Sequence, residues 1–212
     1  MKPTAKKQPK KPVKKSQKTV LCLRTCKKDG TSHSGFRWPL EVGVVVRAPD
    51  WEPTKECGHG LHGLLWGQGD ADLVDSSPEA VGMVVEVLKK DVVDLTNKVK
   101  FPRCTIRFVG SLGEAASWLA RETGRVVHYA TVTAGTDGTA TAGDRGTATA
   151  GPGGTATAGS GGEIHIQYYD HKTGRYRTAV GYVGEARIEP GVLYRVEAGK
   201  LVKVKRTKRA KL

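Results

Sequence analysis

The sequence predicts an α+β fold that is mainly β. Three observations lead to this class. Short β-branched segments separated by glycine and proline recur along most of the chain, and one amphipathic segment carries helix start and stop signals. Residues 131–162 repeat an octapeptide four times, as TVTAGTDG, TATAGDRG, TATAGPGG and TATAGSGG. We therefore expect a small N-terminal α+β domain, a short Thr/Ala/Gly octapeptide β-solenoid and a C-terminal β-hairpin cap.

The divisions of the chain follow from shifts in composition. The two ends are rich in lysine and lack aromatic residues, so they cannot bury enough apolar area to offset the entropy of ordering. The expected segments are a basic disordered tail (1–18), the N-terminal α+β domain (19–128), the β-solenoid (129–162), the β-hairpin cap (163–202) and a second basic disordered tail (203–212).

The N-terminal domain is expected to hold several strands and one helix. The strands are predicted at 19–26, 44–47, 81–87, 92–95 and 104–109 from their β-branched content. Residues 56–70 contain five glycines and predict a tight loop, and 97–102 predict a connection. The helix is expected over 112–122, because Ser111 and Glu114 have the spacing of a capping box and Gly124 suits a helix C-terminus.

Each octad offers four residues of strand and four of turn, which leaves two architectures open. An antiparallel meander would mix threonine and alanine on both faces of its sheet. A solenoid whose coil takes two octads would point alanine inward and threonine outward in every strand. The uniformity of the copies favours the solenoid. A strand-like segment at 126–130 precedes the repeat, and hairpins with turns at 170–174 and 198–199 follow it.

Charge is concentrated at the chain ends. Eight lysines in residues 1–18 and six basic residues in 203–212 account for the whole formal charge of +14. Flexible basic tails favour contact with nucleic acid or another polyanion without sequence preference, and the alternative is that they serve solubility alone. The residues expected to make this contact are Lys6, Lys7, Lys10, Lys11, Lys14, Lys15, Lys205, Arg206, Lys208 and Arg209.

One short segment combines three potential metal ligands. Cys57, His59 and His62 lie within six residues, and Zn²⁺ binds side chains of these types. The spacing matches no established finger pattern, so the competing interpretation is a glycine-built turn with Cys57 and His62 packed as ordinary core groups. Catalytic residues stay unknown, because the common mechanistic motifs are absent from the sequence.

Other features set the compartment and suggest further surfaces. The four cysteines are too few and too scattered for a disulfide scaffold, and no apolar run approaches the length of a membrane helix, so we expect a cytoplasmic protein without a membrane partner. Three tryptophans in the loop-rich segment would line a ligand cleft or anchor a small core. They are Trp38, Trp51 and Trp66.

Three sequence segments carry a resemblance to a known family. They are ECGHGLHGLLWG, KVKFPRC and the Ala/Thr/Gly octads. Together they resemble an uncharacterised bacterial and phage domain family with a Cys-x-x-Gly-Leu/Phe-His core followed by Ala/Thr/Gly-rich repeats. Cys57, Gly60, Leu61 and His62 match that core. The resemblance implies the layout of the chain and no activity.

The sequence therefore predicts a non-enzymatic binding or structural protein, whose tails contact a polyanion and whose folded body docks to a protein partner. An alternative is an enzyme or a metal- or ligand-binding domain centred on residues 57–62. A minor alternative comes from the octads, because regularly spaced Thr-x-Thr segments on a flat face resemble an ice-binding surface; two rungs on each face would be a small one.

Overall fold

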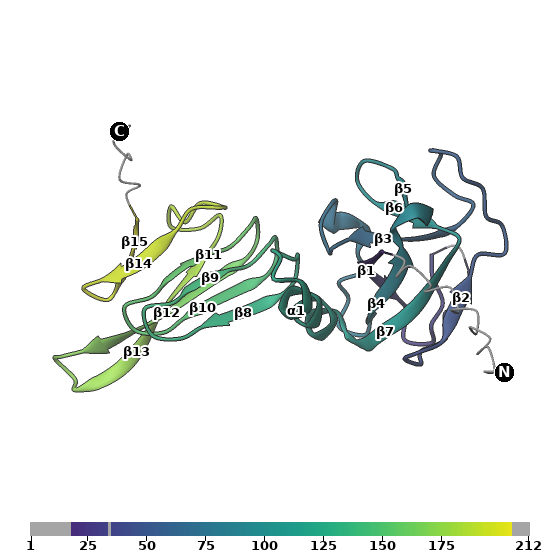
Figure 1. Cartoon of the computed structure of the whole chain (residues 1–212). Helices are drawn as coiled ribbons and strands as arrows, with labels where there is room; N and C mark the ends of the chain where they lie inside the picture. The colour runs from purple at the N-terminus through teal and green to yellow at the C-terminus, as the bar shows by residue number, and fades with distance from the viewer. Residues whose placement is uncertain (1–17, 34, 205–212) are drawn as a thin grey trace, which may run out of the picture.

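A computed structural model describes residues 18–33 and 35–204 of the chain. Its described part is mainly β, with one α-helix and several sheets, which confirms the predicted class (Figure 1). One seven-stranded sheet belongs to the N-terminal region, residues 18–126, and two four-stranded sheets follow it. Figure 1 shows the helix between these two parts. None of the residues predicted to contact a polyanion is among those described.

The N-terminal sheet has the strand order β2-β7-β4-β1-β3-β6-β5, and its neighbouring strands are antiparallel. Its strands are β1 (Thr19–Cys26), β2 (Val45–Arg47), β3 (Leu61–Leu65), β4 (Val81–Leu88), β5 (Val93–Asp94), β6 (Val99–Phe101) and β7 (Arg103–Ser111). Two single turns of 3₁₀ helix, Ala71–Leu73 and Lys89–Asp91, lie in its connections.

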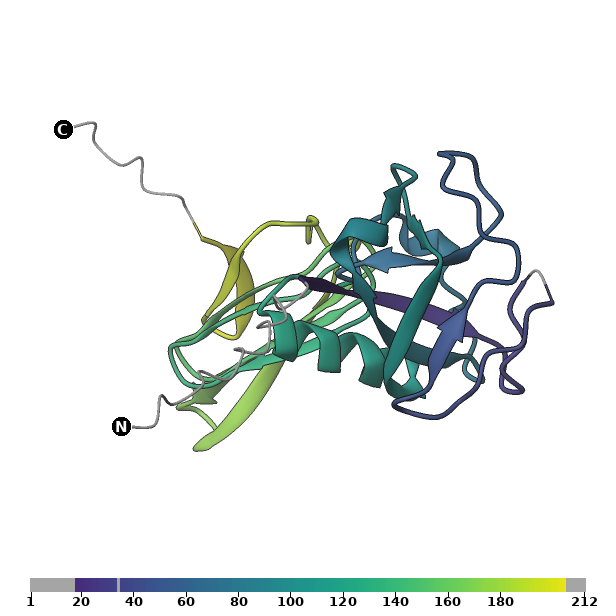
Figure 2. The same cartoon turned by 45° about the vertical axis from the view of Figure 1, so that its right-hand side comes forward.

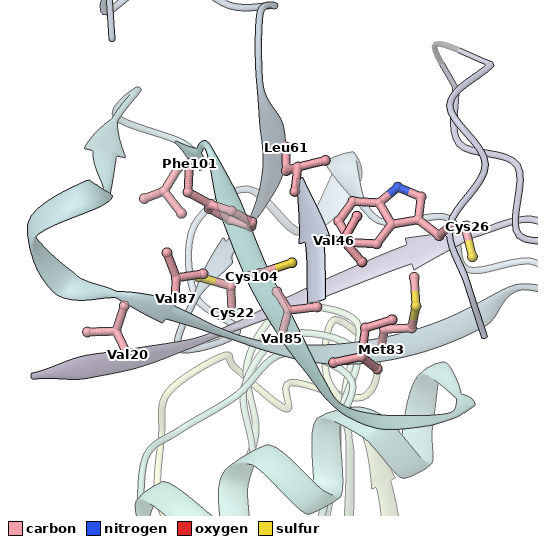
Figure 3. Close-up of a cluster of buried hydrophobic side chains, with 13 residues drawn as sticks. Val20, Cys22, Cys26, Val46, Leu61, Met83, Val85, Val87, Phe101 and Cys104 are labelled. Atoms are coloured by element: carbon pink, nitrogen blue, oxygen red, sulfur yellow. The ribbon is translucent and has the colours of Figure 1, made fainter. Parts of the chain in front are cut away.

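Both faces of this sheet are apolar, because successive side chains of a strand point to opposite faces. On β4, Met83 and Val85 belong to one core and Val84 to the other. Figure 3 shows the first core, in which Cys22 and Cys104 lie close to Val85 and Val87. The three buried cysteines of this region are free thiols that serve as small apolar groups.

The helix α1 (Leu112–Thr123) covers the second face of the sheet. Ser111 and Glu114 form the predicted capping box, and Gly124 ends the helix with a left-handed φ of 63°. Leu112, Leu119 and three alanines form its buried face. No helix among the described residues is long and apolar enough to cross a membrane.

Two segments predicted as loops contain strands. Residues 56–70 include β3, and residues 97–102 include β6. The five glycines of residues 56–70 favoured a loop over a strand. Gly63 is nevertheless part of β3, because an added Cβ there would lie 3.1 Å from both Cys22 Cβ and Leu23 O. Glycine at this position therefore permits the close approach of β3 to β1 rather than a turn.

The octads form half of each of the two smaller sheets, with β8 and β9 as edge strands. They supply β8 (Thr131–Ala134), β9 (Thr139–Thr141), β10 (Thr147–Ala150) and β11 (Thr155–Thr157). The sheet orders are β13-β12-β10-β8 and β15-β14-β11-β9, where the remaining strands are β12 (Glu163–Asp170), β13 (Arg175–Tyr182), β14 (Tyr194–Glu197) and β15 (Lys200–Lys203). Figure 2 shows β8 to β11 stacked beyond α1.

The strand-like segment before the repeat is not a strand. Residues 127–130 instead form a turn that lies against the turn of the second octad, with Gly143 N donating to Val127 O at 3.2 Å and Tyr129 N donating to Asp144 O at 2.8 Å. Tyr129 has a φ of 63°, outside the β region. The β-branched pair Val126-Val127 indicated a strand, but Val127 is buried by packing against α1 and not by a sheet.

Candidate functional site

The octad strands pair in parallel at an offset of 16 residues. Thr131 lies opposite Thr147 and Thr133 opposite Thr149 in one sheet, and Thr139 lies opposite Thr155 and Thr141 opposite Thr157 in the other. A parallel offset of two octads is incompatible with an antiparallel meander, in which each octad would pair with the next. Equivalent residues therefore stand side by side on neighbouring strands.

Alanine and threonine point to opposite sides of these strands. Six alanines of octads two to four are between 0% and 3% exposed and form a core between the two sheets. Ile164 and Ile166 of β12 continue this core beyond the last octad. The threonines face outward, which leaves two flat surfaces made of hydroxyl and methyl groups.

We define the threonine face as Thr131, Thr133, Thr147 and Thr149, on β8 and β10. Thr131 and Thr133 are exposed, and Thr147 and Thr149 are half-buried by their neighbours. Within the described residues, no hydrogen bond to the protein occupies any of these four hydroxyls. All four are therefore free to bond water.

The opposite threonine face, Thr139, Thr141, Thr155 and Thr157 on β9 and β11, is less available. The hydroxyls of Thr139 and Thr155 are hydrogen-bonded to each other at 3.0 Å. The hydroxyl of Thr157 is buried and has no partner among the described residues. The two surfaces have the same composition, but only the threonine face offers all of its hydroxyls to solvent.

Glycine-built turns hold the threonine columns in register. In every octad the last glycine donates its N–H to the O of the glycine three residues earlier, at 3.0 to 3.2 Å. The third residue of each turn has a positive φ, from 55° at Asp137 and Arg145 to 74° at Gly153. Pro152 suits the second position because its ring fixes φ near the value needed there.

The octads are joined to the N-terminal region by a network of polar contacts. Tyr129 Oη donates to Ala71 O at 2.8 Å and accepts from Arg145 Nη1 at 2.7 Å, and Arg145 also forms an ion pair with Asp72. His128 N donates to Gly67 O at 3.1 Å. The turn of the second octad is thus anchored to the N-terminal region.

Each column of the threonine face ends after two rungs. The register places Glu163 beside Thr147 and His165 beside Thr149, and a hydrogen bond of 3.0 Å joins His165 Nε2 to a carboxylate oxygen of Glu163. On the next strand, β13, the corresponding positions are Tyr182 and Val180, which are 51% and 47% exposed. The uniform array is therefore limited to two strands.

The predicted metal ligands Cys57, His59 and His62 all line one cavity but have different surroundings. Cys57 is exposed, and His59 Nδ1 lies 3.9 Å from carboxylates of Asp50 and Glu52. His62 lies on β3, with its Nε2 buried. Within 18–33 and 35–204, no group of three or more His, Cys, Asp or Glu side chains is placed to hold a metal ion. Metal binding at this segment stays a prediction.

The three tryptophans have different surroundings. Trp38 is 2% exposed and lines a cavity of the N-terminal region. Trp51 packs against Gly60, where an added Cβ would lie 2.9 Å from its ring, and Trp66 is covered by the guanidinium of Arg125 at 4.7 Å. Neither Trp51 nor Trp66 lines that cavity. A ligand cleft shared by all three stays a prediction.

Comparison with known proteins links the chain to bacterial ice nucleation proteins. It is 40% identical over 108 residues, half of its length, to the ice nucleation protein of Pseudomonas fluorescens. Over 103 residues (48% of the chain) it is 34% identical to that of Xanthomonas campestris pv. translucens, and over 121 residues (56%) it is 31% identical to InaA of Pantoea ananas. The chain spans 9%, 6% and 9% of these three relatives.

No family model matches the chain, and no solved structure matches it significantly. The resemblance to an uncharacterised bacterial and phage family is therefore wrong, because the similarity found is to ice nucleation proteins. The prediction of a protein that acts through polyanion-binding tails is wrong for the same reason. These relatives instead support the minor alternative of an ice-binding threonine surface.

Proposed function

We propose that this protein binds ice through the threonine face, and that the octads form a short solenoid whose coil takes two of them. The observation that carries the proposal is the 16-residue parallel register, which stacks Thr131 on Thr147 and Thr133 on Thr149. The names of the bacterial relatives support the same chemistry.

The geometry of the face suits ordered water. Neighbouring strands lie about 4.8 Å apart, and alternate residues along a strand about 6.7 Å apart. Four threonines at these spacings form a two-dimensional array of hydroxyl groups, with repeats comparable to those between oxygen atoms in ice. The methyl groups between the hydroxyls disfavour disordered liquid water, and an array that is already ordered loses little entropy on binding.

The size of the face limits what it does. An ice nucleus grows only above a critical size, so a template much smaller than that size nucleates weakly. The described octads carry two rungs on each face. We therefore propose adsorption to existing ice, which slows crystal growth, with weak nucleation by a single copy.

The test compares two lysine substitutions in the first octad. Thr133 lies on the threonine face, whereas Thr136 lies in the adjacent turn; both are exposed. Thr133→Lys places a long charged side chain across the array, and we expect it to lose most of the inhibition of ice recrystallisation. Thr136→Lys adds the same charge three residues away and is expected to retain the activity of the unmodified chain.

A third variant identifies the face. Thr141→Lys disturbs the opposite threonine face and is expected to leave most of the activity in place, because the hydroxyls there are partly occupied or buried. Circular dichroism would establish that all three variants fold. Equal activity of Thr133→Lys and Thr136→Lys, or an inactive unmodified chain, would refute ice binding through this face.

A further inference from the structure

A cavity of about 1060 Å³ lies in the N-terminal region, where β1 and β3 separate. The two strands pair at Cys22 with Leu65 and at Leu23 with Leu64, and the described ladder ends there. Beyond this point residues 24–27 and the facing residues 57–63 line the cavity, and they do not pair with each other in the described ladder. The opening is thus built into the sheet.

Arg24 occupies the point where the strands separate. It shares a face of β1 with Cys22 and Cys26, which are core residues, so a cation stands in an otherwise apolar row. Its guanidinium carbon lies 3.5 Å from the centre of the Trp38 ring. Nη1 donates to His62 O and Nη2 to Thr25 O, both at 3.2 Å, so the side chain bridges the gap.

The hydrogen-bonding capacity of this arginine is not filled. A guanidinium has five N–H donors, and Nε of Arg24 is buried without a partner among the described residues. Within 18–33 and 35–204 no carboxylate lies within ion-pair distance of Arg24. Burial of a cation without a counter-ion is costly, so an anionic partner would be favourable here.

His62 supplies a second unfilled group at the same place. Its Nε2 is buried and has no partner in the described part of the chain. Burial first, and then the charges of Lys98, Arg24 and Lys100, lower the pKa of His62 to about 4, so the ring is neutral at pH 7. Arg24 and Lys98 therefore bring positive charge to the lining of the cavity, together with the neutral imidazole of His62.

Three carboxylates also line the cavity, but each has a partner of its own. Asp72 pairs with Arg145 at the junction with the octads. Asp75 accepts from Ser77 N at 3.0 Å, and Asp50 lies 3.9 Å from His59 Nδ1. None of the three forms an ion pair with Arg24 in the described part of the chain.

We propose that this cavity binds a small organic anion, with Arg24 as the main binding residue and His62 Nε2 as a second polar contact. An oxyanion such as a carboxylate or a phosphate accepts hydrogen bonds from guanidinium N–H groups, and Arg24 has N–H donors that no group among the described residues accepts. The volume suits a small metabolite rather than a single ion. This site is independent of the threonine face.

The experiment measures the binding of citrate and of inorganic phosphate to the full chain by titration calorimetry. The variants are Arg24→Gln, His62→Leu and, as a matched control, Arg125→Gln. Arg125 also stacks on a tryptophan, Trp66, but does not line the cavity. All variants keep the lysines of the chain ends, so any binding there is common to all of them.

We expect saturable binding of one equivalent of at least one probe, weakened about tenfold or more by Arg24→Gln and within about twofold of the unmodified chain in Arg125→Gln. The probe that binds more tightly distinguishes carboxylate from phosphate recognition. If Arg24→Gln fails to fold, His62→Leu decides: weakened binding supports the site, and unchanged binding overturns it. Absence of saturable binding, or equal loss in Arg24→Gln and Arg125→Gln, also overturns it.

Discussion

His62 illustrates at the residue scale how a single site can link charge to stability. Its ring is partly buried beside three cations, Lys98, Arg24 and Lys100, and its pKa is lowered to about 4. The ordinary pKa of histidine is about 6.5, so between these values the unfolded chain binds a proton that the folded chain does not. The folded state is therefore penalised as the pH falls.

This difference predicts a pH dependence of stability. The contribution of neutral His62 is fully present above about pH 6.5 and is lost as the pH falls toward 4. The free energy of unfolding, measured with urea at pH 7 and at pH 5, should therefore decrease more for the unmodified chain than for His62→Leu. An identical decrease in both would show that the pKa of His62 is the same in the folded and the unfolded chain.

Lys100 is a second residue whose role the sequence does not reveal. It is 0% exposed, and its Nζ donates to Glu56 O at 2.8 Å and to Thr54 Oγ1 and Gly58 O at 3.2 Å. The buried Lys100 side chain thus donates hydrogen bonds to three oxygens of the loop that contains Cys57. This contact explains how a loop with few apolar side chains keeps one conformation beside the cavity.

At the element scale, the octad turns depend on glycine for close stacking. An added Cβ at Gly154 would lie 2.7 Å from Gly138 O, and one at Gly162 would lie 2.7 Å from Gly146 O, in each case 16 residues earlier. No side chain fits between turns at that separation. The last position of the octad therefore requires glycine because the turn beneath it leaves no room for a Cβ, and not because of its backbone φ.

The fifth octad position provides a matched pair for a stability test. An added Cβ at Gly151 would lie 2.7 Å from Gly135 C and Thr136 N, whereas at Gly135 it would meet nothing within 4 Å. Neither glycine has a positive φ. We expect Gly151→Ala to lower the free energy of unfolding by about 1–3 kcal/mol and Gly135→Ala to change it by less than about 1 kcal/mol. Urea denaturation compares them; equal effects would contradict turn stacking.

Elements with strong local signals could be predicted from the sequence. The capping box of Ser111 and Glu114 gave the start of α1 correctly, and the turn residues near Asp170 and Ala198 gave both hairpins. The strands β3 and β6 were missed, because their evidence is not local. Gly63 is in a strand only because β1 approaches it, and β6 is a three-residue strand placed by its pairing with β3.

The site was predictable only in part for the same reason. The alternation of threonine and alanine indicated outward threonines, and the structure places Thr131 beside Thr147. The inequality of the two faces depends on contacts that the octads do not encode, such as the burial of the Thr157 hydroxyl. Likewise Arg24 sits in an ordinary strand pattern, and its unfilled donor follows from where β1 and β3 separate.

At the scale of the whole molecule, the octads have a thin alanine core that lies between two anchors, which are the flanking parts with larger side chains. Each buried alanine methyl contributes only about 0.8 kcal/mol. Larger side chains stand at both ends: Val127 and Tyr129 toward the N-terminal region, and Ile164, Ile166 and Tyr194 toward the C-terminal hairpins. The flatness of the threonine face therefore depends on both flanking parts.

Removal of one anchor should unfold the octads and spare the N-terminal sheet. A chain that ends at Gly162 lacks β12 to β15, so Ala148, Ala150 and Ala156 lose Ile164, Ile166 and Tyr194 from their core. The cores of the seven-stranded sheet contain none of the deleted residues. We expect hydrogen exchange to show lost amide protection at 147–158 and retained protection in β1, β4 and β7. As a control, Ile164→Val in the full chain removes one methylene, which costs about 0.5–1.5 kcal/mol, and should leave the octads protected. Retained protection at 147–158 in the shortened chain would mean that the alanine core and the N-terminal anchor suffice, and the threonine face would then be independent of the hairpins that follow it.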